Sequence, residues 1–212
     1  MPDHILRLLD LGEVPYLRSQ TIYHAVASAL RADSPDTVVL TLPREPYACI
    51  GYHQDLDGEI DLERCRARGL PVLRREIGGG TVYLDRQQLF YHIICHQRRA
   101  PRRADELYRT FLRGPIAAYR ALGVEARLSS LNDIAAGERK IGGTGAGTIG
   151  EAVVVSGSLI FDFSHSAMAA LLRAPSEAFR RQAERLMRRY VTSLRAELGR
   201  AVPLAEGRAA LL

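Results

Sequence analysis

The chain has 212 residues, of which 47% are hydrophobic and 25% are charged, proportions that are typical of a globular protein. It contains no run of about 18 or more apolar residues, so no membrane-spanning helix is expected. Its first residues, MPDHILRLLDLGEVP, lack the basic start and long apolar core of a signal peptide. The net charge of +5 favours an anionic partner without identifying it.

The expected elements, in chain order, begin with a helix over residues 16–31, where apolar side chains recur at helical spacing. Strands are expected over 37–43 and 47–54, then a short helix over 60–69 that Gly69 ends. Three further strands over 70–75, 80–85 and 88–97 are separated by a glycine turn and a polar loop, and a helix follows over 106–123, with Gly123 as its stop.

Beyond residue 123 the pattern predicts a strand, a turn and a strand over 126–140, a glycine loop over 141–147, a hairpin within 151–163 and a helix over 176–199. This last helix carries Phe179, Ala183, Leu186, Met187 and Tyr190 on one face. Helices mixed with hairpin-linked strands predict an α+β fold with a mixed, mostly antiparallel sheet. No linker divides the chain, so residues 1–212 are expected to form one domain.

Cysteine and lysine are both scarce. Cys49, Cys65 and Cys95 show no CxxC spacing, which fits reduced thiols in a cytoplasmic protein. Lys140 is the sole lysine, so arginine supplies almost all of the positive charge. High-GC codon usage explains the loss of lysine elsewhere, but it does not explain why one remains inside a glycine-rich segment.

The first glycine cluster lies in RREIGGGTVYLD, residues 74–85. Gly78, Gly79 and Gly80 can expose a row of backbone N–H groups to phosphate or carboxylate oxygens. Arg74 and Arg75 bind such oxygens with planar, permanently charged groups, but alternation on a strand points them to opposite faces. Asp85 is positioned to bind a metal ion that accompanies a phosphate. The alternative is a glycine-rich hairpin with solvated arginines.

The second cluster is Lys140 followed by four glycines, Gly142, Gly143, Gly145 and Gly147. Because the lysine precedes the glycines, the segment is not a phosphate-binding P-loop. We expect Lys140 at a strand end, with its ammonium reaching a neighbouring pocket where carboxylate and phosphate oxygens meet. Two glycine segments that each carry a cation make a joint anion site more probable than either does alone.

These residues resemble the lipoate–protein ligases of the biotin/lipoate ligase superfamily. RREIGGGTVYLD resembles their RRxxGGGxVxHD stretch, LNDIAAGERKIGGTG is similar to their NDxxxxGxKxxG segment, and SGSLIFDF resembles their HGTLLxD strand. The likeness runs from about residue 15 to 199. It implies a biotin/lipoate ligase fold, related to class II synthetases, in which helices flank the sheet.

The resemblance also implies a function. ATP and Mg²⁺ would activate lipoic or octanoic acid as an acyl-adenylate, and a lysine of a lipoyl-carrier domain, or of a protein like the glycine-cleavage H protein, would accept the acyl group. Lys140 would be catalytic, with Asp85, Asn132 and Asp133 near the reaction centre or Mg²⁺. The nucleotide and acyl-adenylate would contact Arg75, Gly78, Gly79, Gly80, Thr81, Val82, Tyr83 and Lys140. Lipoate would contact Arg74, Gly79, Lys140, Gly143 and Gly157.

The chain departs from the family pattern in three ways. Leu84 and Ser156 stand where the family usually has histidines. The chain also ends near residue 212, whereas many such ligases add a small C-terminal accessory domain. We expect that the enzyme either works without this domain or receives it as a separate small subunit.

Two other functions from the same pocket are weighed against the ligase. An octanoyl or lipoyl transferase would take the acyl group from a carrier protein through a cysteine thioester, which requires an activated thiolate in the pocket. The related transferases carry that cysteine just upstream of the lysine segment or past it, and this chain has none there. A non-catalytic sensor of lipoate or ATP would have no need to retain Lys140. We therefore favour the ligase.

Two further clusters have simpler explanations. His92 and His96 share one strand face and Tyr91 and Cys95 the other, and nothing supplies the converging ligands that zinc needs. The last long helix carries five arginines: Arg180, Arg181, Arg185, Arg188 and Arg189. They form either a solvated face or a docking surface for an acidic carrier domain. No motif indicates nucleic-acid binding.

Overall fold

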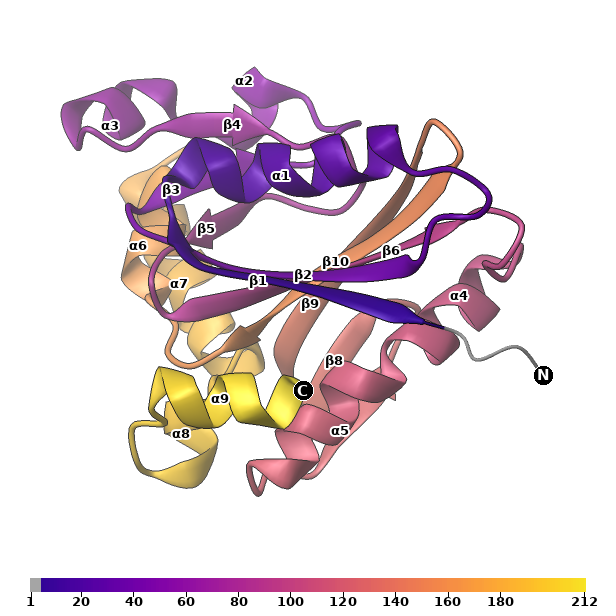
Figure 1. The fold of residues 1–212 in the computed structure, drawn as a ribbon. Coiled ribbons are helices and arrows are strands. Elements are labelled where there is room, and N and C mark those ends of the chain that lie inside the picture. Colours follow the sequence, from indigo (N-terminus) through magenta and orange to yellow (C-terminus); the bar gives the residue numbers. More distant parts are fainter. Residues whose placement is uncertain (1–4) are drawn as a thin grey trace.

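A mixed seven-stranded sheet organises the molecule (Figure 1). The computed structural model describes residues 5–212; residues 1–4, which begin the segment searched for a signal peptide, lie outside the described residues. Across the sheet the strands are β1 (Leu6–Val14), β2 (Asp36–Pro43), β6 (Gln88–His96), β10 (Ala152–Ile160), β9 (Arg139–Ile149), β8 (Asp133–Ala136) and β7 (Ala126–Ser129). β1 and β2 are parallel and the other pairs antiparallel, which confirms the predicted sheet type.

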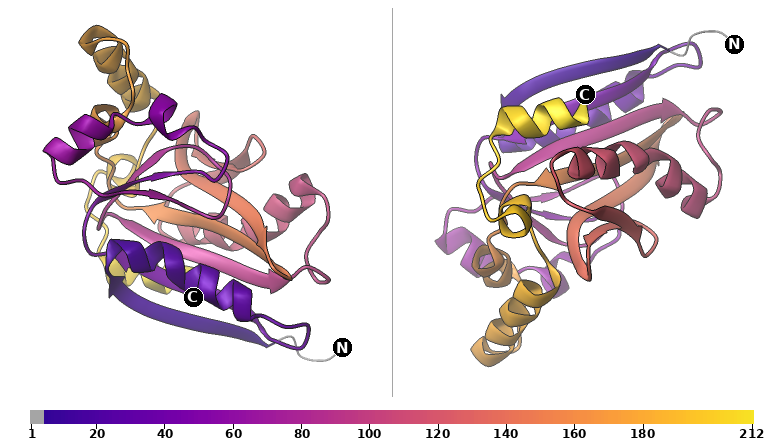
Figure 2. Two further views of the ribbon diagram at one scale, coloured as in Figure 1. Left: turned by 90° about the horizontal axis from the view of Figure 1, so that it is seen from above. Right: turned by 90° about the horizontal axis from the view of Figure 1, so that it is seen from below.

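A smaller sheet and several helices cover the large sheet. The small sheet has the order β4 (Val72–Arg74), β3 (Tyr47–Ile50) and β5 (Val82–Leu84). The helices are α1 (Tyr16–Ala29), α2 (Leu56–Glu59), α3 (Leu62–Ala67), α4 (Ala104–Phe111), α5 (Arg113–Ala121), α6 (His165–Leu171), α7 (Glu177–Tyr190), α8 (Leu194–Leu198) and α9 (Leu204–Leu211). Figures 1 and 2 show α1 and the small sheet on one face of the large sheet, and α5 and α9 on the other.

The large sheet has a hydrophobic core on each of its two faces, because successive strand residues point to opposite faces of the sheet. Leu40 of β2 belongs to the larger core cluster, which includes Leu112 and Tyr119 from the α4–α5 segment. Its neighbour Val39 belongs to a second cluster on the other face, together with Tyr23 of α1. The alternation within β2 therefore fixes which helix covers which face.

Apart from one glycine loop and one hairpin, the expected elements form with adjusted bounds, and four observed elements were not predicted. These are β1, α2, α6 and α9. The helix expected over 106–123 is two helices, α4 and α5, that meet at Leu112 just ahead of the Gly114–Pro115 pair. The helix expected over 176–199 ends at Tyr190, and Ser193 then caps α8 by accepting a hydrogen bond from the Ala196 backbone N–H.

Two glycine-based predictions about backbone were wrong. The glycines at 142–147 lie inside β9 instead of a loop, and residues 152–160 form one strand, β10, instead of both arms of a hairpin. Glycine in a strand marks a place where a neighbour approaches closely. A Cβ at Gly157 would lie 2.4 Å from the Tyr91 hydroxyl, and one at Gly145 would lie 2.4 Å from the Gly78 carbonyl oxygen. The glycines therefore make room for packing and do not mark turns here.

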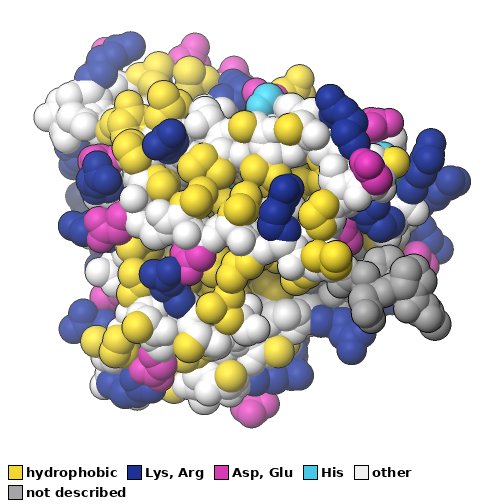
Figure 3. Space-filling view, viewed as in Figure 1, with side chains coloured by type: hydrophobic (Ala, Val, Ile, Leu, Met, Phe, Trp, Pro, Cys, Tyr) yellow, Lys and Arg dark blue, Asp and Glu magenta, His cyan; other side chains and the backbone are white. Residues whose placement is uncertain are grey.

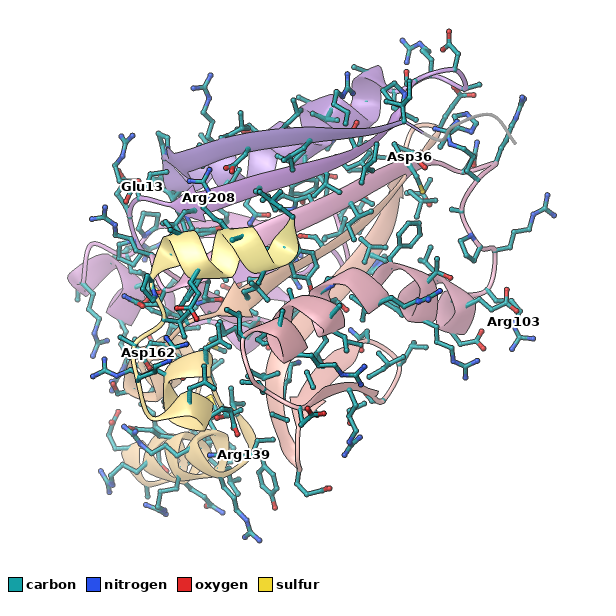
Figure 4. All side chains as sticks on the ribbon, turned by 60° about the horizontal axis from the view of Figure 1, so that its bottom comes forward. Glu13, Asp36, Arg103, Arg139, Asp162 and Arg208 are labelled. Atoms are coloured by element: carbon teal, nitrogen blue, oxygen red, sulfur yellow. The ribbon has the colours of Figure 1, made fainter. Side chains whose placement is uncertain are left out.

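The C-terminal segment is fastened to the sheet by ion pairs. Arg139 of β9 lies 2.7 Å from Glu197 of α8, and Arg208 of α9 pairs with Asp10 of β1; both arginines are labelled in Figure 4. Apolar side chains gather over α1 and β1 on the face shown in Figure 3. The exposed large apolar residues of these two elements are Leu6, Leu8, Leu11 and Leu17. Within residues 5–212, no helix combines the length and apolar character needed to cross a bilayer.

Candidate active site

A pocket of about 270 Å³ lies between the small sheet and strands β9 and β10 of the large sheet. Loop 75–81, α6 and α7 complete its walls. The lining residues that sequence analysis had singled out are Arg75, Gly79, Gly80, Thr81, Val82, Tyr83, Leu84, Asn132, Lys140, Gly143, Gly145, Ser156 and Gly157. Two motifs about 60 residues apart in the sequence therefore converge on one cavity, as the resemblance implied.

The first glycine cluster forms a loop that is pressed between two backbone segments. Gly79 has φ +110°, a conformation that L side chains rarely adopt. A Cβ at Gly51 would lie 1.9 Å from the Gly79 carbonyl oxygen, and Gly145 approaches Gly78 from the other side. Gly80 has no atom within 4 Å of an added Cβ, and it lines the pocket. The loop is thus held from both sides while Gly80 is left facing open space.

The two arginines before this loop diverge, as strand alternation predicted. Arg75 lines the pocket, and its guanidinium donates hydrogen bonds to the carbonyl oxygens of Gly78 (3.1 Å) and Gly80 (2.8 Å). Arg74 instead donates to the carbonyl oxygens of Gly51 and Tyr52 and to that of Gln54 (2.7 Å). Arg74 is therefore not brought to the pocket, and its contacts fix the loop that follows β3.

Lys140 reaches the pocket from the start of β9, at a strand end as predicted. Its Nζ lies 2.7 Å from Oδ1 of Asp133, and the lysine side chain is 43% exposed. The side chain lies across Gly143, where an added Cβ would come within 3.0 Å of Nζ. A glycine at this position leaves the space along the strand that the ammonium occupies.

Asn132 holds the turn between β7 and β8 against β9. Its side-chain amide donates to the Thr144 carbonyl oxygen (2.6 Å), and the Thr144 hydroxyl donates to the Asn132 carbonyl oxygen (2.5 Å). Ser130 in the same turn has a positive φ of 53°. These contacts make Asn132 a positioning residue for the strand that carries Lys140.

The pocket lining combines apolar side chains with two cations. The large apolar lining residues include Ile77, Leu84, Phe90, Phe163, Met168, Met187 and Val191. Arg75 and Lys140 are its lining cations. Such a pocket suits a ligand that has both an apolar chain and an anionic group.

A buried histidine lies behind the pocket wall. Ser156, which faces the pocket, contacts Nδ1 of His92 on β6 through its hydroxyl (2.7 Å). The His92 ring stacks between Tyr23 and Phe90, with centroid distances of 4.6 and 5.8 Å. Burial lowers the pKa of His92 to about 3, so the ring is neutral at physiological pH. Its Nε2 has no hydrogen-bond partner among the described residues.

No cysteine is among the residues that line the pocket. Cys49 is fully buried behind Arg75, with Sγ 3.9 Å from the guanidinium, and burial raises the pKa of its thiol. Burial also raises the pKa of Cys65, and it raises that of Cys95 to about 11. The three thiols are therefore protonated and enclosed, which is the opposite of an activated nucleophile.

Several predicted site residues lie outside the lining. Gly78, Arg74 and Asp85 are not among the lining residues. Asp85 accepts a hydrogen bond from the Gln87 backbone N–H (2.9 Å), and burial raises its pKa. Asp133 is not in the lining but contacts Lys140 directly. The lining residues that sequence analysis missed are Gln20, Ile77, Gln88, Phe90, Thr144, Ser158, Ile160, Phe163, Met168, Met187 and Val191. Ile77, Thr144, Ser158, Ile160 and Phe163 lie within the three motifs but were not singled out there. The other six lie outside the motifs, and distant elements bring them to the cavity.

Comparisons with known proteins agree with this geometry. The octanoyltransferase LipM of Symbiobacterium thermophilum is 31% identical over 228 residues, which cover 95% of this chain and 82% of that protein. The lipoate–protein ligase A subunit 1 of Thermoplasma acidophilum is 28% identical over 160 residues, which cover 68% of this chain and 58% of that protein. Both kinds of lipoylation protein are thus similar to this chain.

Solved structures give the same result for the fold. A bi-partite lipoate protein ligase from Thermoplasma acidophilum, described with its E2 lipoyl domain, superposes with a TM-score of 0.86 at 25% identity and covers 97% of this chain and 80% of that chain. A lipoate–protein ligase A bound with ATP superposes with a TM-score of 0.80 at 24% identity, covering 97% of this chain and 81% of that chain. The sequence profile of the lipoyl protein ligase A/B catalytic domain matches residues 15–212. The chain therefore belongs to the lipoyl protein ligase A/B catalytic domain family.

Proposed function

We propose that the protein is an ATP-dependent ligase that joins lipoate or octanoate to a lysine of a lipoyl-carrier domain. The observation that carries this proposal is a pocket lined by Lys140, Arg75 and many apolar side chains, with no cysteine in its lining. Two fixed cations suit a reaction in which a carboxylate meets a phosphate. A reaction through a thioester needs an accessible thiolate, whereas the three cysteine thiols of this chain are buried.

In the first step a carboxylate oxygen of the acid attacks the α-phosphorus of ATP, a new P–O bond forms, and pyrophosphate leaves. The Lys140 ammonium stabilises the charge that gathers on the α-phosphate, and its contact with Asp133 holds it in place beforehand. Backbone N–H groups of the strand that follows Gly80 bind the other phosphates. The acyl chain lies against apolar side chains such as Ile77 and Phe90.

Mg²⁺ would enter with the nucleotide. In residues 5–212, no group of three or more His, Cys, Asp or Glu side chains is arranged to hold a metal ion. Mg²⁺ commonly needs no such group, since it keeps several waters and binds through one or two carboxylates together with substrate phosphates. Asp133, next to Lys140, is the carboxylate best placed for that role, and the ion would neutralise phosphate charge.

In the second step the acceptor lysine of the carrier domain attacks the carbonyl carbon of the acyl-adenylate. The C–N bond forms, the C–O bond to AMP breaks, and the surplus proton of the amine leaves to solvent. Enclosure of the mixed anhydride between the small sheet and β9 protects it from water until the amine arrives. Because the acyl-adenylate and the acceptor lysine are held next to each other, the attack becomes effectively unimolecular.

A second candidate is an octanoyltransferase, because relatives that align over 95% of this chain carry that name. Transfer from an acyl-carrier protein through a thioester requires an exposed thiolate next to the acyl group. Cys49 contacts the pocket residue Arg75, and it is buried with a raised pKa. The ligase agrees better with this arrangement.

Release of pyrophosphate tests the proposal. Purified protein with ATP, Mg²⁺ and octanoate is expected to release pyrophosphate in an acid-dependent manner. Lys140→Ala should lower the rate about 100-fold or more, since it removes a charge that stabilises the transition state. Arg139→Ala, which alters the neighbouring residue outside the pocket lining, is the matched control and should retain the rate. Equal rates in wild type and Lys140→Ala would contradict the role of the lysine.

A further inference from the structure

α7 is a long helix that touches little of the rest of the molecule. Of its 14 residues, all of which the structure describes, Arg180 alone is buried. In both views of Figure 2 this helix projects from one corner of the molecule. Three of its exposed side chains are large and apolar, and a patch of exposed apolar side chains is a common sign of an interaction surface.

The outward side chains of α7 form two rows. Arg181, Arg185 and Arg189 are four residues apart and therefore lie along one row. Phe179, Leu186 and Tyr190 form the adjacent row, and they are 52%, 47% and 50% exposed. These three residues were predicted to share one apolar face of the helix. They do share it, but the face points to solvent. We call these six residues the α7 outer face.

The arginines of the α7 outer face lack acidic partners. Arg180 is buried, contacts Asp61 and donates to carbonyl oxygens at the end of α6, so it belongs to neither of the two predicted alternatives, a solvated face or a docking surface. Arg188 pairs with Glu184 at 2.7 Å. Within residues 5–212, Arg181, Arg185 and Arg189 form no salt bridge, and Arg189 lies over the Tyr190 ring at 5.3 Å. Because no acidic side chain pairs with these three guanidinium groups, they are available to bind carboxylates of another molecule.

α7 carries the outer face on one side and contributes to the pocket wall on the other. Met187, on the inner side of the same helix, and Val191, which follows it, both line the pocket. The Thr192 backbone N–H donates to the Lys140 carbonyl oxygen at 2.9 Å, so the end of α7 is fastened to the strand that carries the lysine. A protein bound along α7 would therefore lie next to the element that forms this part of the pocket wall.

We propose that the α7 outer face is the docking surface for the acidic side of the protein domain that presents the acceptor lysine, an inference that rests on the proposed function. Aromatic and arginine side chains are those that contribute most to protein interfaces. A single helix of this length is about 21 Å long and provides a contact at the small end of interface sizes. Such a contact suits a protein substrate that must leave after each turnover.

Charge reversal on this face tests the proposal. The triple variant Arg181→Glu, Arg185→Glu, Arg189→Glu should raise the KM for a purified E2 lipoyl domain from the same genome about tenfold at low salt. Its acid-dependent pyrophosphate release without that domain should stay within about twofold of wild type, because none of the three residues lines the pocket. The Arg→Lys triple keeps the charges and should keep a KM near that of wild type.

The matched control carries the same charge change elsewhere. Arg102, Arg109 and Arg113 are exposed residues on or next to α4 and α5, and none lines the pocket. Their triple change to glutamate should leave the KM for the domain near that of wild type. An equal rise of KM in both glutamate triples would reduce the effect to net charge and overturn a specific docking surface, as would an unchanged KM in the α7 triple.

Direct binding separates this proposal from the proposed function. Titration of the E2 lipoyl domain into the protein by calorimetry needs no ATP, so it decides the docking surface even if wild type releases no pyrophosphate. Weaker binding by the α7 triple and unchanged binding by the control triple are expected. If sedimentation shows that wild type self-associates through this face and that the α7 triple does not, a second copy is the occupant, and the proposal is wrong.

Discussion

The two glycine-rich segments of the pocket need glycine for different structural reasons. Gly78, Gly79 and Gly80 form a loop whose backbone is clasped by Arg75, whereas the glycines from 142 to 147 lie inside the regular strand β9. In the loop, Gly79 supplies a backbone conformation closed to other residues. In the strand, Gly145 and Gly143 remove side chains so that a loop and a lysine can lie close. Glycine density alone therefore does not distinguish a turn from a tightly packed strand.

The largest effect is expected where loop and strand touch. In Gly145→Ala the new Cβ would lie 2.4 Å from the Gly78 carbonyl oxygen, which is backbone and cannot move aside cheaply. We expect a loss of about 2–3 kcal/mol in the free energy of unfolding and a loss of acid-dependent pyrophosphate release. Denaturant titration measures the first quantity. Gly80→Ala, with nothing within 4 Å of its Cβ, is the control; an equal loss in both variants would refute the packing argument.

Gly143→Ala should affect activity more than stability. Its Cβ would meet Cε and Nζ of Lys140 at 2.9 and 3.0 Å, and this flexible side chain can swing away. The free energy of unfolding should change by less than about 1 kcal/mol, while pyrophosphate release should fall about 10- to 100-fold because the ammonium leaves its place. Wild-type activity in a folded variant would show that the lysine does not need to lie along the strand.

The stability of the protein should depend on pH through His92, which lies behind the pocket wall that β10 forms. Its pKa is about 3 in the folded protein and about 6.5 when the chain is unfolded, so below pH 6.5 the unfolded state binds the extra proton. Stability is fully present above about pH 6.5 and falls by about 1.4 kcal/mol per pH unit as the pH drops towards 3. Unfolding titrations at pH 7.0 and about pH 5.5 measure the slope. His92→Gln should flatten it, and an unchanged slope would remove His92 as its cause.

The smallest effect is expected at Cys49. Cys49→Ala removes a buried thiol that contacts Arg75 only at 3.9 Å, so we expect a loss of about 1 kcal/mol in stability. Acylation of the E2 lipoyl domain should continue at a rate near that of wild type once the folded fraction is taken into account. Cys95→Ala on β6 is the matched control, because Cys95 is also buried and lies outside the lining. Loss of acyl transfer in Cys49→Ala alone would favour the thioester route.

Much of the pocket could be predicted from the sequence. Lys140, Arg75 and Asn132 lie in motifs whose order and spacing resemble a known family, and the structure brings all three to one cavity. The resemblance also predicted the fold, which the family profile and solved structures confirm. Alternation on a strand correctly separated Arg74 from Arg75.

The remainder depends on tertiary contacts that no local pattern encodes. Gln20 and Met187 line the same pocket from helices near opposite ends of the chain, and nothing in their neighbourhoods marks them. Periodicity showed which side chains of α7 share a face, but it could not show that Phe179 and Leu186 lack a covering element. The glycines of β9 and β10 were interpreted as turn residues because their packing partners, Gly78 and Tyr91, come from distant segments of the chain.

Two reaction mixtures test the central claim, which is activation by adenylation. One contains the protein, ATP, Mg²⁺, labelled octanoate and a purified E2 lipoyl domain. The other lacks ATP and supplies the same label as an octanoyl thioester on an acyl-carrier protein. The account predicts label on the lipoyl domain in the first mixture, dependent on Lys140, and none in the second. Label in the second mixture alone would contradict it and make the protein a transferase.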